Sequence, residues 1–217
     1  IRMNKTKKAI VFGTNGQAEV VSYLLEKDSE YEVIAFCCSA QYRESDVLFN
    51  KPLVDFEDVE VKFPPTDYEM YVSLSYADQN KVRERFYYEA KAKGYTLLSY
   101  ISSKTTNYAK SIGDNTFIFE DNTIQPFVSI GNNVVLWSGN HIGHHSSIQD
   151  NCFISSHVVV SGHCTIGKNS FIGVNSTLRD GISIGSFNTL GAGCLMIKSS
   201  EKNQIYIGTK ATKYIKK

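Results

Sequence analysis

The chain has 217 residues, of which 42% are hydrophobic and 21% are charged, a balance typical of a globular protein. Its 23 Lys and Arg residues almost cancel its 22 Asp and Glu residues, which excludes a nucleic-acid binder that works through bulk positive charge. No apolar run approaches the roughly 20 residues of a membrane-spanning helix, so we expect no membrane span. Five cysteines without metal-ligand spacing favour a reduced, cytoplasmic chain.

The first hundred residues alternate short apolar runs with amphipathic segments. Strands are expected over 8–12, 31–36, 68–74 and 96–100, and helices over 18–26 and 78–93. Gly94 is expected to close the second helix. This order of elements predicts a small Rossmann-like parallel sheet.

A glycine turn, Gly13-Thr14-Asn15-Gly16-Gln17, joins the first expected strand to the first expected helix. Free backbone N–H groups in such a turn can bind a phosphate. The turn lacks the full dinucleotide fingerprint, and the second strand runs into Cys37-Cys38-Ser39, without an acid for a ribose diol. We therefore expect no NAD site, and taken alone the turn fits a plain strand–helix junction equally well.

From Ile112 onward, an aliphatic residue recurs at every sixth position. The residue after it is often glycine, and the residue four positions after it is mostly small or β-branched. The fifteen aliphatic positions are Ile112, Ile118, Ile124, Ile130, Leu136, Ile142, Ile148, Ile154, Val160, Ile166, Ile172, Leu178, Ile184, Leu190 and Met196. A fixed short period of this kind predicts a solenoid, with the aliphatic side chains pointing to its axis.

Three hexapeptides are expected to form one coil, so that residues 18 apart stack on one another. The glycines that follow the aliphatic positions, from Gly113 to Gly191, are expected to supply positive φ at the corners. Cys152, Cys164 and Cys194 fall at the small inward position. They are predicted to fill the core rather than to act as nucleophiles or metal ligands.

All five histidines lie between positions 141 and 163. The 18-residue spacing stacks His145 on His163, and His144 on Gly162. Histidine suits a general base because its pKa lies near neutrality. From spacing alone, however, His144 fits a solvated corner residue equally well.

A Rossmann-like domain over 1–103, followed by a hexapeptide solenoid over 104–217, resembles the hexapeptide-repeat sugar acyltransferases. That family includes sialic acid O-acetyltransferase and the UDP-bacillosamine and perosamine N-acetyltransferases. The resemblance implies a left-handed parallel β-helix, acetyl-CoA as co-substrate, and a UDP- or dTDP-linked sugar as acceptor. The product would serve surface polysaccharide such as the O-antigen of lipopolysaccharide. Whether the acceptor is an amine or a hydroxyl stays open.

The same resemblance implies the catalytic residues. Ile142-Gly143-His144-His145 matches the family's Ile-x-His-x motif, which makes His144 the general base. The corresponding oxyanion donor is the backbone N–H of Gly162. His145 stands where an acid commonly follows, so the group that orients His144 is open, with Asp150 as a distant candidate.

Binding residues follow from the resemblance too. The phosphates of the acceptor are expected at Asn15, Gly16 and Gln17, with Ser75 as a further contact. The coenzyme A contacts are expected at Phe153, where the family has a second histidine, and at Gly162, Val174 and Ala192. After the last repeat, Ile205 to Lys210 resembles the family's closing strand, with Lys210 and Lys213 as candidate phosphate contacts.

The resemblance also implies a homotrimer with each active site between neighbouring solenoids. Trp137 and Phe127 belong either to an interface or to the acceptor pocket. One alternative is a metal-dependent trimer of the gamma carbonic anhydrase type, with ligands from His144, His157 and His163. Its spacing does not match that family's pair of histidines five apart, and no metal ligand is assigned. The other alternative is a non-catalytic nucleotide-sugar-binding module.

Overall fold

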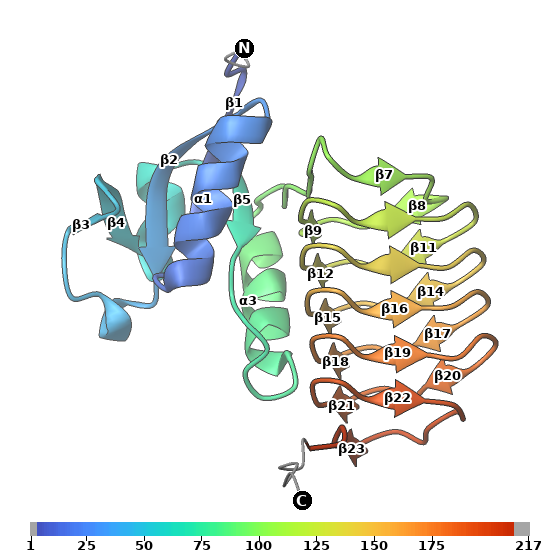
Figure 1. Ribbon diagram of the computed structural model, residues 1–217. Helices are drawn as coiled ribbons and strands as arrows, with labels where there is room; N and C mark the ends of the chain where they lie inside the picture. The colour runs from blue at the N-terminus through green and yellow to red at the C-terminus, as the bar shows by residue number, and fades with distance from the viewer. Residues whose placement is uncertain (1–3, 211–217) are drawn as a thin grey trace, which may run out of the picture.

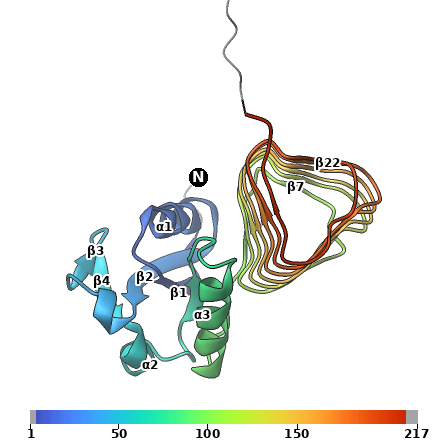
Figure 2. The same ribbon diagram turned by 90° about the horizontal axis from the view of Figure 1, so that it is seen from below.

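A computed structural model describes residues 4–210 of the chain. An N-terminal α/β unit lies beside a solenoid of stacked coils (Figure 1). Viewed along the solenoid axis, the coils superpose as a triangle, and the N-terminal unit packs against one of its sides (Figure 2). The predicted fold class, an α/β unit followed by a left-handed parallel β-helix, is confirmed. The predicted division at residues 103 and 104 stays a prediction.

The N-terminal sheet has five strands in the order β3-β4-β2-β1-β5. They are β1 (Lys7–Phe12), β2 (Tyr31–Cys38), β3 (Val47–Leu48), β4 (Lys51–Asp55) and β5 (Glu69–Val72). All neighbours pair in parallel except β3 and β4. The helical segments are α1 (Gly16–Asp28), α2 (Val59–Lys62), α3 (Lys81–Ala92) and two 3₁₀ turns, Ala40–Tyr42 and Phe56–Asp58.

Helix α1 begins where the side chain of Asn15 accepts a hydrogen bond from the Ala18 N–H at 3.2 Å, the usual chemistry of an N-cap. Val21 and Leu25 repeat four residues apart and are buried against the sheet. Alternate residues of β1 point to opposite faces, so Ala9 joins the α1 side and Ile10 joins the α3 side.

Helix α3 begins later than the sequence predicts. The expected start at Asp78 is wrong, because Asp78, Gln79 and Asn80 all have left-handed φ angles between 46° and 65°. The buried side-chain amide of Asn80 donates to the carbonyl oxygens of Asn169 and Ser170 in the solenoid. The turn is therefore held by a partner about 90 residues away in sequence, and the helix forms only from Lys81 onward. Gly94, with φ of +92°, follows its end as predicted.

The strand expected over 96–100 is also wrong. Leu97 makes only an isolated bridge to Met70. The strand forms instead as β6 (Tyr100–Ile101), which pairs with the first full coil of the solenoid. Tyr100 N–H donates to Thr116 O at 2.9 Å, so the segment that leaves the N-terminal sheet already belongs to the solenoid face.

The solenoid has three flat faces of parallel two-residue strands. Face 1 holds β6, β9 (Phe117–Ile118), β12 (Val135–Leu136), β15 (Phe153–Ile154), β18 (Phe171–Ile172), β21 (Thr189–Leu190) and β23 (Ile205–Tyr206). Face 2 holds β7 (Thr106–Asn107), β10 (Thr123–Ile124), β13 (His141–Ile142), β16 (Val159–Val160), β19 (Thr177–Leu178) and β22 (Leu195–Met196). Face 3 holds β8 (Ser111–Ile112), β11 (Ser129–Ile130), β14 (Ser147–Ile148), β17 (Thr165–Ile166) and β20 (Ser183–Ile184). We call the edges between them corner 1–2, corner 2–3 and corner 3–1.

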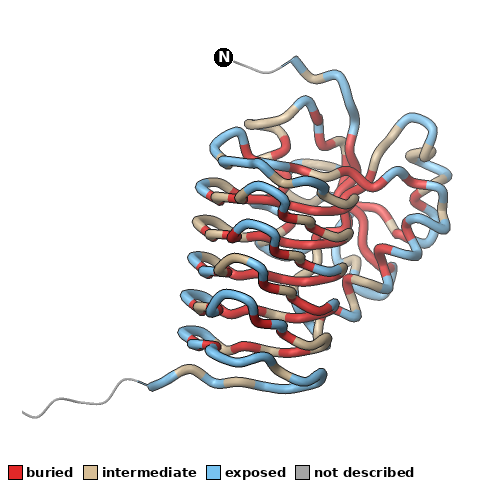
Figure 3. The backbone as a smooth tube through the Cα atoms, turned by 90° about the vertical axis from the view of Figure 1, so that its right-hand side faces the viewer, coloured by how far each residue is buried: buried red, intermediate tan, exposed pale blue. Residues whose placement is uncertain are grey.

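The aliphatic residues fill the axis of the solenoid as predicted, and the buried stretches recur at the same places in every coil (Figure 3). Cys152, Cys164 and Cys194 belong to the same core, and all five cysteines are free and buried. Burial raises the pKa of Cys152 to about 12, so this thiol stays protonated and unreactive. Their predicted role as core filler is confirmed.

The predicted reason for the repeat glycines is wrong. The left-handed residues are those two positions later, mostly Asn and His, such as Asn133 and His145. Where glycine follows the aliphatic residue, as at Gly143 and Gly173, the next coil lies too close for a side chain. A Cβ on Gly143 would lie 2.5 Å from the backbone nitrogen of Gly162, and one on Gly173 would lie 2.6 Å from the carbonyl carbon of Gly191.

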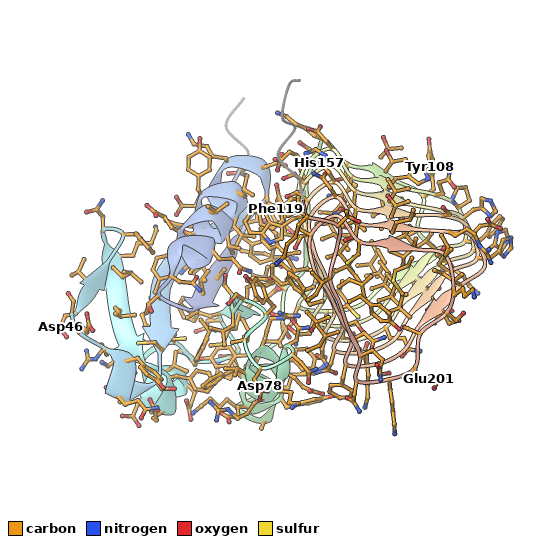
Figure 4. All side chains as sticks on the ribbon, turned by 60° about the horizontal axis from the view of Figure 1, so that its bottom comes forward. Asp46, Asp78, Tyr108, Phe119, His157 and Glu201 are labelled. Atoms are coloured by element: carbon orange, nitrogen blue, oxygen red, sulfur yellow. The ribbon has the colours of Figure 1, made fainter. Side chains whose placement is uncertain are left out.

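One hydrophobic cluster joins the N-terminal unit to face 1. Outward-pointing Phe117 and Phe153 pack there with residues of α1 and of the N-terminal sheet. Phe119 lies at this junction beside α1, whereas Tyr108 lies on the part of the solenoid away from the N-terminal unit (Figure 4). The two units therefore share a core.

The fully buried side chain of Arg83 connects α3 to the solenoid by hydrogen bonds. The guanidinium of Arg83 donates to the carbonyl oxygens of Ser75 at 3.0 Å and Asn151 at 2.9 Å, and to Asn80 Oδ1 at 2.9 Å. Burial lowers the pKa of Arg83 to about 10, so it stays charged at neutral pH. Its charge is distributed over carbonyl and amide oxygens rather than paired with a carboxylate.

Candidate functional site

The histidines are divided between two corners of the solenoid. His144 and His145 follow β13 at corner 2–3, and His163 follows β16 at the same corner one coil further on. The predicted stacking of His145 on His163 is confirmed, with ring centroids 4.9 Å apart and an interplanar angle of 13°. His157 follows β15 at corner 1–2, so face 2 separates it from the other three. The set His144, His157 and His163 is not brought together.

The three histidines of corner 2–3 form one exposed cluster. The Nδ1 atoms of His144 and His145 are 3.1 Å apart, which is a hydrogen-bond distance whose donor depends on the tautomers. The ring of His163 lies 5.0 Å from that of His144, edge to face. Phe127 packs on the other side of His145 with ring centroids 4.6 Å apart. Phe127 therefore supports the cluster and is itself largely exposed.

His144 lies directly on Gly162, as the spacing predicted. A Cβ on Gly162 would lie 2.8 Å from Cε1 and 2.9 Å from Nε2 of the imidazole. The Gly162 N–H donates no hydrogen bond within residues 4–210. An imidazole and a free backbone donor thus lie side by side at an exposed edge.

The side chain at hydrogen-bond distance from the His144 imidazole is its neighbour, His145, and not Asp150. Asp150, the distant candidate, lies at corner 3–1, where its Oδ1 accepts from Asn132 N–H at 2.7 Å. Face 3 separates Asp150 from His144. The Nδ1 atom of His145 lies 3.1 Å from that of His144, and the ring of His163 packs edge to face against the same imidazole.

The residues expected to bind the acceptor gather at the carboxyl edge of the N-terminal sheet. Gly13, with φ of +135°, lies so close to β5 that a Cβ there would be 2.5 Å from Ser73 O. The β1–α1 turn and the end of β5, with Ser75, are therefore adjacent. The Ser75 carbonyl accepts from Arg83.

The turn itself has room and an unused donor. Asn15 uses its side chain to cap α1, and a Cβ on Gly16 would meet nothing within 4 Å. The Nε2 of Gln17 is buried and has no hydrogen-bond partner among the described residues. Gly16 therefore leaves the N-terminus of α1 open, and an anion is stabilised at such a position.

The residues expected to contact coenzyme A are not on one surface of the chain. Val174 and Ala192 lie in successive coils at corner 1–2, and Val174 is 42% exposed. Phe153 is enclosed on face 1 between Tyr76 and Phe171, and only 4% of it is exposed. Gly162 lies at corner 2–3 with His144. Within one chain, face 2 stands between His144 and the expected groove.

A cavity that the sequence did not predict lies between α1 and the upper coils at corner 1–2. Its volume is about 710 Å³, and its lining includes Tyr23, Lys27 and Trp137. Trp137 stacks on Phe119 with ring centroids 4.2 Å apart. The two residues are 18 positions apart, so the spacing of the repeat could have predicted that they stack. Trp137 therefore lies in a cavity and Phe127 at an exposed corner.

Two further expectations concern membranes and the C-terminus. Among residues 4–210, no helix has both the length and the apolar character needed to cross a membrane. Lys210 is exposed, and Lys213 lies outside the described residues.

The repeat region matches a known family profile. Residues 110–144 and 127–162 match the family described as bacterial transferase hexapeptide (six repeats). No match was found among curated protein sequences. The predicted hexapeptide repeat is thus confirmed independently over 110–162.

Solved structures share the fold over nearly the whole chain. The acetyltransferase domain of PglB from Neisseria gonorrhoeae, in complex with acetyl coenzyme A, superposes with a TM-score of 0.81 at 22% identity, covering 95% of this chain and 97% of that one. A mutant perosamine N-acetyltransferase from Caulobacter crescentus, in complex with CoA and GDP-perosamine, gives 0.81 at 19% identity, covering 93% of each chain. WeeI from Acinetobacter baumannii gives 0.80 at 17% identity, covering 94% and 97%. The two-unit fold predicted from the sequence is therefore one that these proteins share.

Proposed function

We propose that this protein is an acetyl-CoA-dependent acetyltransferase that acts on a nucleotide-linked sugar. The observation that carries the proposal is the exposed His144 imidazole lying on Gly162, whose N–H is unused among the described residues. Acyl transfer from a thioester needs such a base beside an oxyanion donor. Acetyl-CoA and a sugar nucleotide are supported as substrates by the complexes of two proteins with this fold.

In the proposed reaction, His144 takes the proton from the acceptor amine or hydroxyl as that group attacks the thioester carbonyl. The Gly162 N–H stabilises the oxyanion of the tetrahedral intermediate. The intermediate collapses by breaking the C–S bond, and the proton held by His144 passes to the departing thiolate. His145 orients the base if it accepts from His144 Nδ1, which leaves Nε2 of His144 with its lone pair free.

The acceptor is assigned to the N-terminal unit. Its phosphates bind at the turn of Asn15, Gly16 and Gln17, where the helix N-terminus and the unpaired Gln17 amide favour an anion. Ser75 borders the same edge. The nucleotide is proposed to be UDP or dTDP, and GDP joins the candidates because GDP-perosamine is bound in a protein of this fold.

The active site is proposed to form between chains of a homotrimer. Corner 2–3, which carries His144, points away from the N-terminal unit that carries the acceptor turn (Figure 2). Val174 and Ala192 are separated from His144 by face 2. A neighbouring solenoid that placed its corner 1–2 against corner 2–3 would unite the base, the coenzyme groove and the acceptor. The acetylated product would enter surface polysaccharide such as the O-antigen of lipopolysaccharide, and the site of action is proposed to be the cytoplasm.

The test is thiol release from acetyl-CoA against UDP-, dTDP- and GDP-linked amino sugars and their hydroxyl counterparts. We expect turnover with one acceptor, and His144→Ala should lower kcat by roughly 10²–10⁴-fold, the usual worth of a general base. The variant should keep its melting temperature and its affinity for CoA, because His144 is exposed and packs on no core residue.

Near-wild-type turnover by His144→Ala would remove the assignment of the base. Binding of a sugar nucleotide without turnover, across several acyl donors, would support a non-catalytic binding module instead.

A further inference from the structure

We propose that His144, His145 and His163 form a binding site for one divalent transition-metal ion such as Zn²⁺. One ring nitrogen from each of the three residues lies within 4.8 Å of the others. In the single chain all three side chains are exposed at corner 2–3, so its fold does not have to open for an ion to enter. The site differs from the set containing His157, which the structure separates.

The closest pair already has the spacing of two ligands on one ion. Zinc lies about 2.0–2.1 Å from imidazole nitrogens, so two such nitrogens on a tetrahedral ion are roughly 3.4 Å apart. The Nδ1 atoms of His144 and His145 are 3.1 Å apart. In the metal-free chain this contact is an N–H···N hydrogen bond, and both rings become Nε2–H tautomers when Nδ1 binds the ion.

The backbone holds the three rings in place. His145 and His163 have left-handed φ angles of 58° and 57°, which set the direction of both side chains. The two coils are tied together by a hydrogen bond from His163 N–H to His144 O at 2.9 Å. The ring of His144 lies against Gly162. Two adjacent coils of a rigid solenoid supply all three ligands, so the backbone does not have to rearrange when the ion binds. The rings of His145 and His163 are stacked at 13°, so one of them must turn about its side-chain bonds before both nitrogens face the same ion.

The donor set selects the class of ion. Imidazole nitrogens suit Zn²⁺, Cu²⁺ and Ni²⁺, whereas Mg²⁺ and Ca²⁺ require oxygen ligands. No carboxylate belongs to the cluster among the described residues. Three protein ligands leave at least one coordination position for water.

A bound ion would have a direct chemical consequence, which rests on the proposed function. With Nδ1 of His144 bound to the metal, Nε2, which is the proposed proton acceptor, would carry the ring hydrogen and would have no free lone pair. The base would then be unable to accept a proton from the acceptor as it does in the metal-free chain. The ion is therefore inferred to be an inhibitor that competes for the catalytic histidine, not a cofactor.

The experiment is titration of the chelator-treated full chain with Zn²⁺ by calorimetry, with Co²⁺ absorption as a second readout. Wild-type protein should bind one ion per chain, and Co²⁺ should show nitrogen coordination without a thiolate charge-transfer band. His163→Asn and His145→Asn should weaken the affinity at least about tenfold, since even outer contacts of a metal site are worth 10–100-fold.

The matched control is His157→Asn. His157 is also an exposed corner histidine with left-handed φ, and the chain itself places asparagine at this position in other coils, as at Asn175. All three variants should therefore fold, and His157→Asn should bind Zn²⁺ as the wild type does.

No binding by the wild type would overturn the proposal, as would unchanged affinity in His163→Asn. An equal loss of Zn²⁺ affinity in His157→Asn would show that the ion does not bind at this cluster. The titration contains no substrate, so its outcome is independent of the turnover test of His144→Ala.

Discussion

Two positions carry different backbone constraints in the hexapeptides that have glycine after the aliphatic residue. The residue after the inward aliphatic lies against the next coil, where a Cβ on Gly143 would lie 2.5 Å from a backbone nitrogen. The residue two places later turns the chain in the left-handed conformation, which His145 adopts with φ of 58°. The first constraint is steric crowding and the second is conformational, so they select different residue types.

Gly162 lies at corner 2–3, and the group that lies closest to the site of its missing Cβ is the ring of His144, the proposed base. The three atoms nearest to a Cβ there all belong to the His144 ring, and the φ of Gly162 is not in the left-handed region. Gly162→Ala should therefore displace the imidazole without straining the backbone. We expect kcat to fall roughly 10–100-fold, the effect of misplacing a catalytic group by about 1 Å, with little change in melting temperature.

Gly143→Ala provides the contrast for that variant. Its Cβ would press on the backbone of the next coil, so we expect a lowered melting temperature as the main effect. Full turnover in Gly162→Ala would mean that the His144 ring can move without cost to the reaction.

Helix α3 is attached to the solenoid by a ladder of asparagines at corner 3–1. Asn115 donates to Asn133 and Asn133 donates to Asn151, each at 2.8 Å, and Asn151 donates to Asn169 at 3.3 Å. Asn169 then donates to Glu84 of α3 at 2.8 Å. The ladder stacks the coils and ends on the helix, so it links one element of each unit.

Of the residues on α3, Arg83 is the one whose substitution we expect to lower the free energy of unfolding most. Arg83→Met would leave several buried carbonyl oxygens without a donor, each costing about 1–3 kcal/mol. We expect the free energy of unfolding to fall by at least about 3 kcal/mol in a urea titration.

Arg85→Met is the matched control, because Arg85 lies on the same helix with an exposed side chain and one weak ion pair to Glu89 at 3.6 Å. Its effect should stay within about 0.5 kcal/mol. Similar losses in the two variants would show that the buried network at Arg83 does not support the junction.

On the scale of the whole molecule, the sequence predicted what is periodic and missed what is not. The column from Ile112 to Met196 repeats a local signal many times, so the solenoid and the stacking of His145 on His163 were both predictable. The turn at Asn80 and the strand at Tyr100 depend on partners far along the chain, which local patterns do not contain. The neighbour relation of His144 to Gly162 was predictable, whereas the cavity at Trp137 needed the packing of α1.

An active site shared between chains predicts complementation. His144→Ala removes the base, and Gly16→Asp places a repelling carboxylate in the open space of the acceptor turn. Each variant alone should be inactive. After random mixing of the two chains, about a quarter of the interfaces in a ring should unite two intact halves and regain turnover.

Each variant refolded alone is the control for that mixture, and subunit exchange is followed with a tag on one chain. Exchange without regained turnover would place the whole site within a single chain.

The corner residues with left-handed φ, three positions after an inward aliphatic, have a consequence for how a histidine cluster can arise. Asparagine, aspartate and histidine all occupy this column, at Asn133, Asp121 and His163 among others. The codons of these three residues differ from one another by one first-position base. A single-base mutation can therefore replace an asparagine or aspartate at such a corner by histidine without a change in backbone conformation. Because residues 18 apart stack, a second histidine in the same column of the next coil lies beside the first. Substitutions in this column can therefore change the chemistry of a corner without changing the fold, and the stacked His145 and His163 are the result expected of two such substitutions.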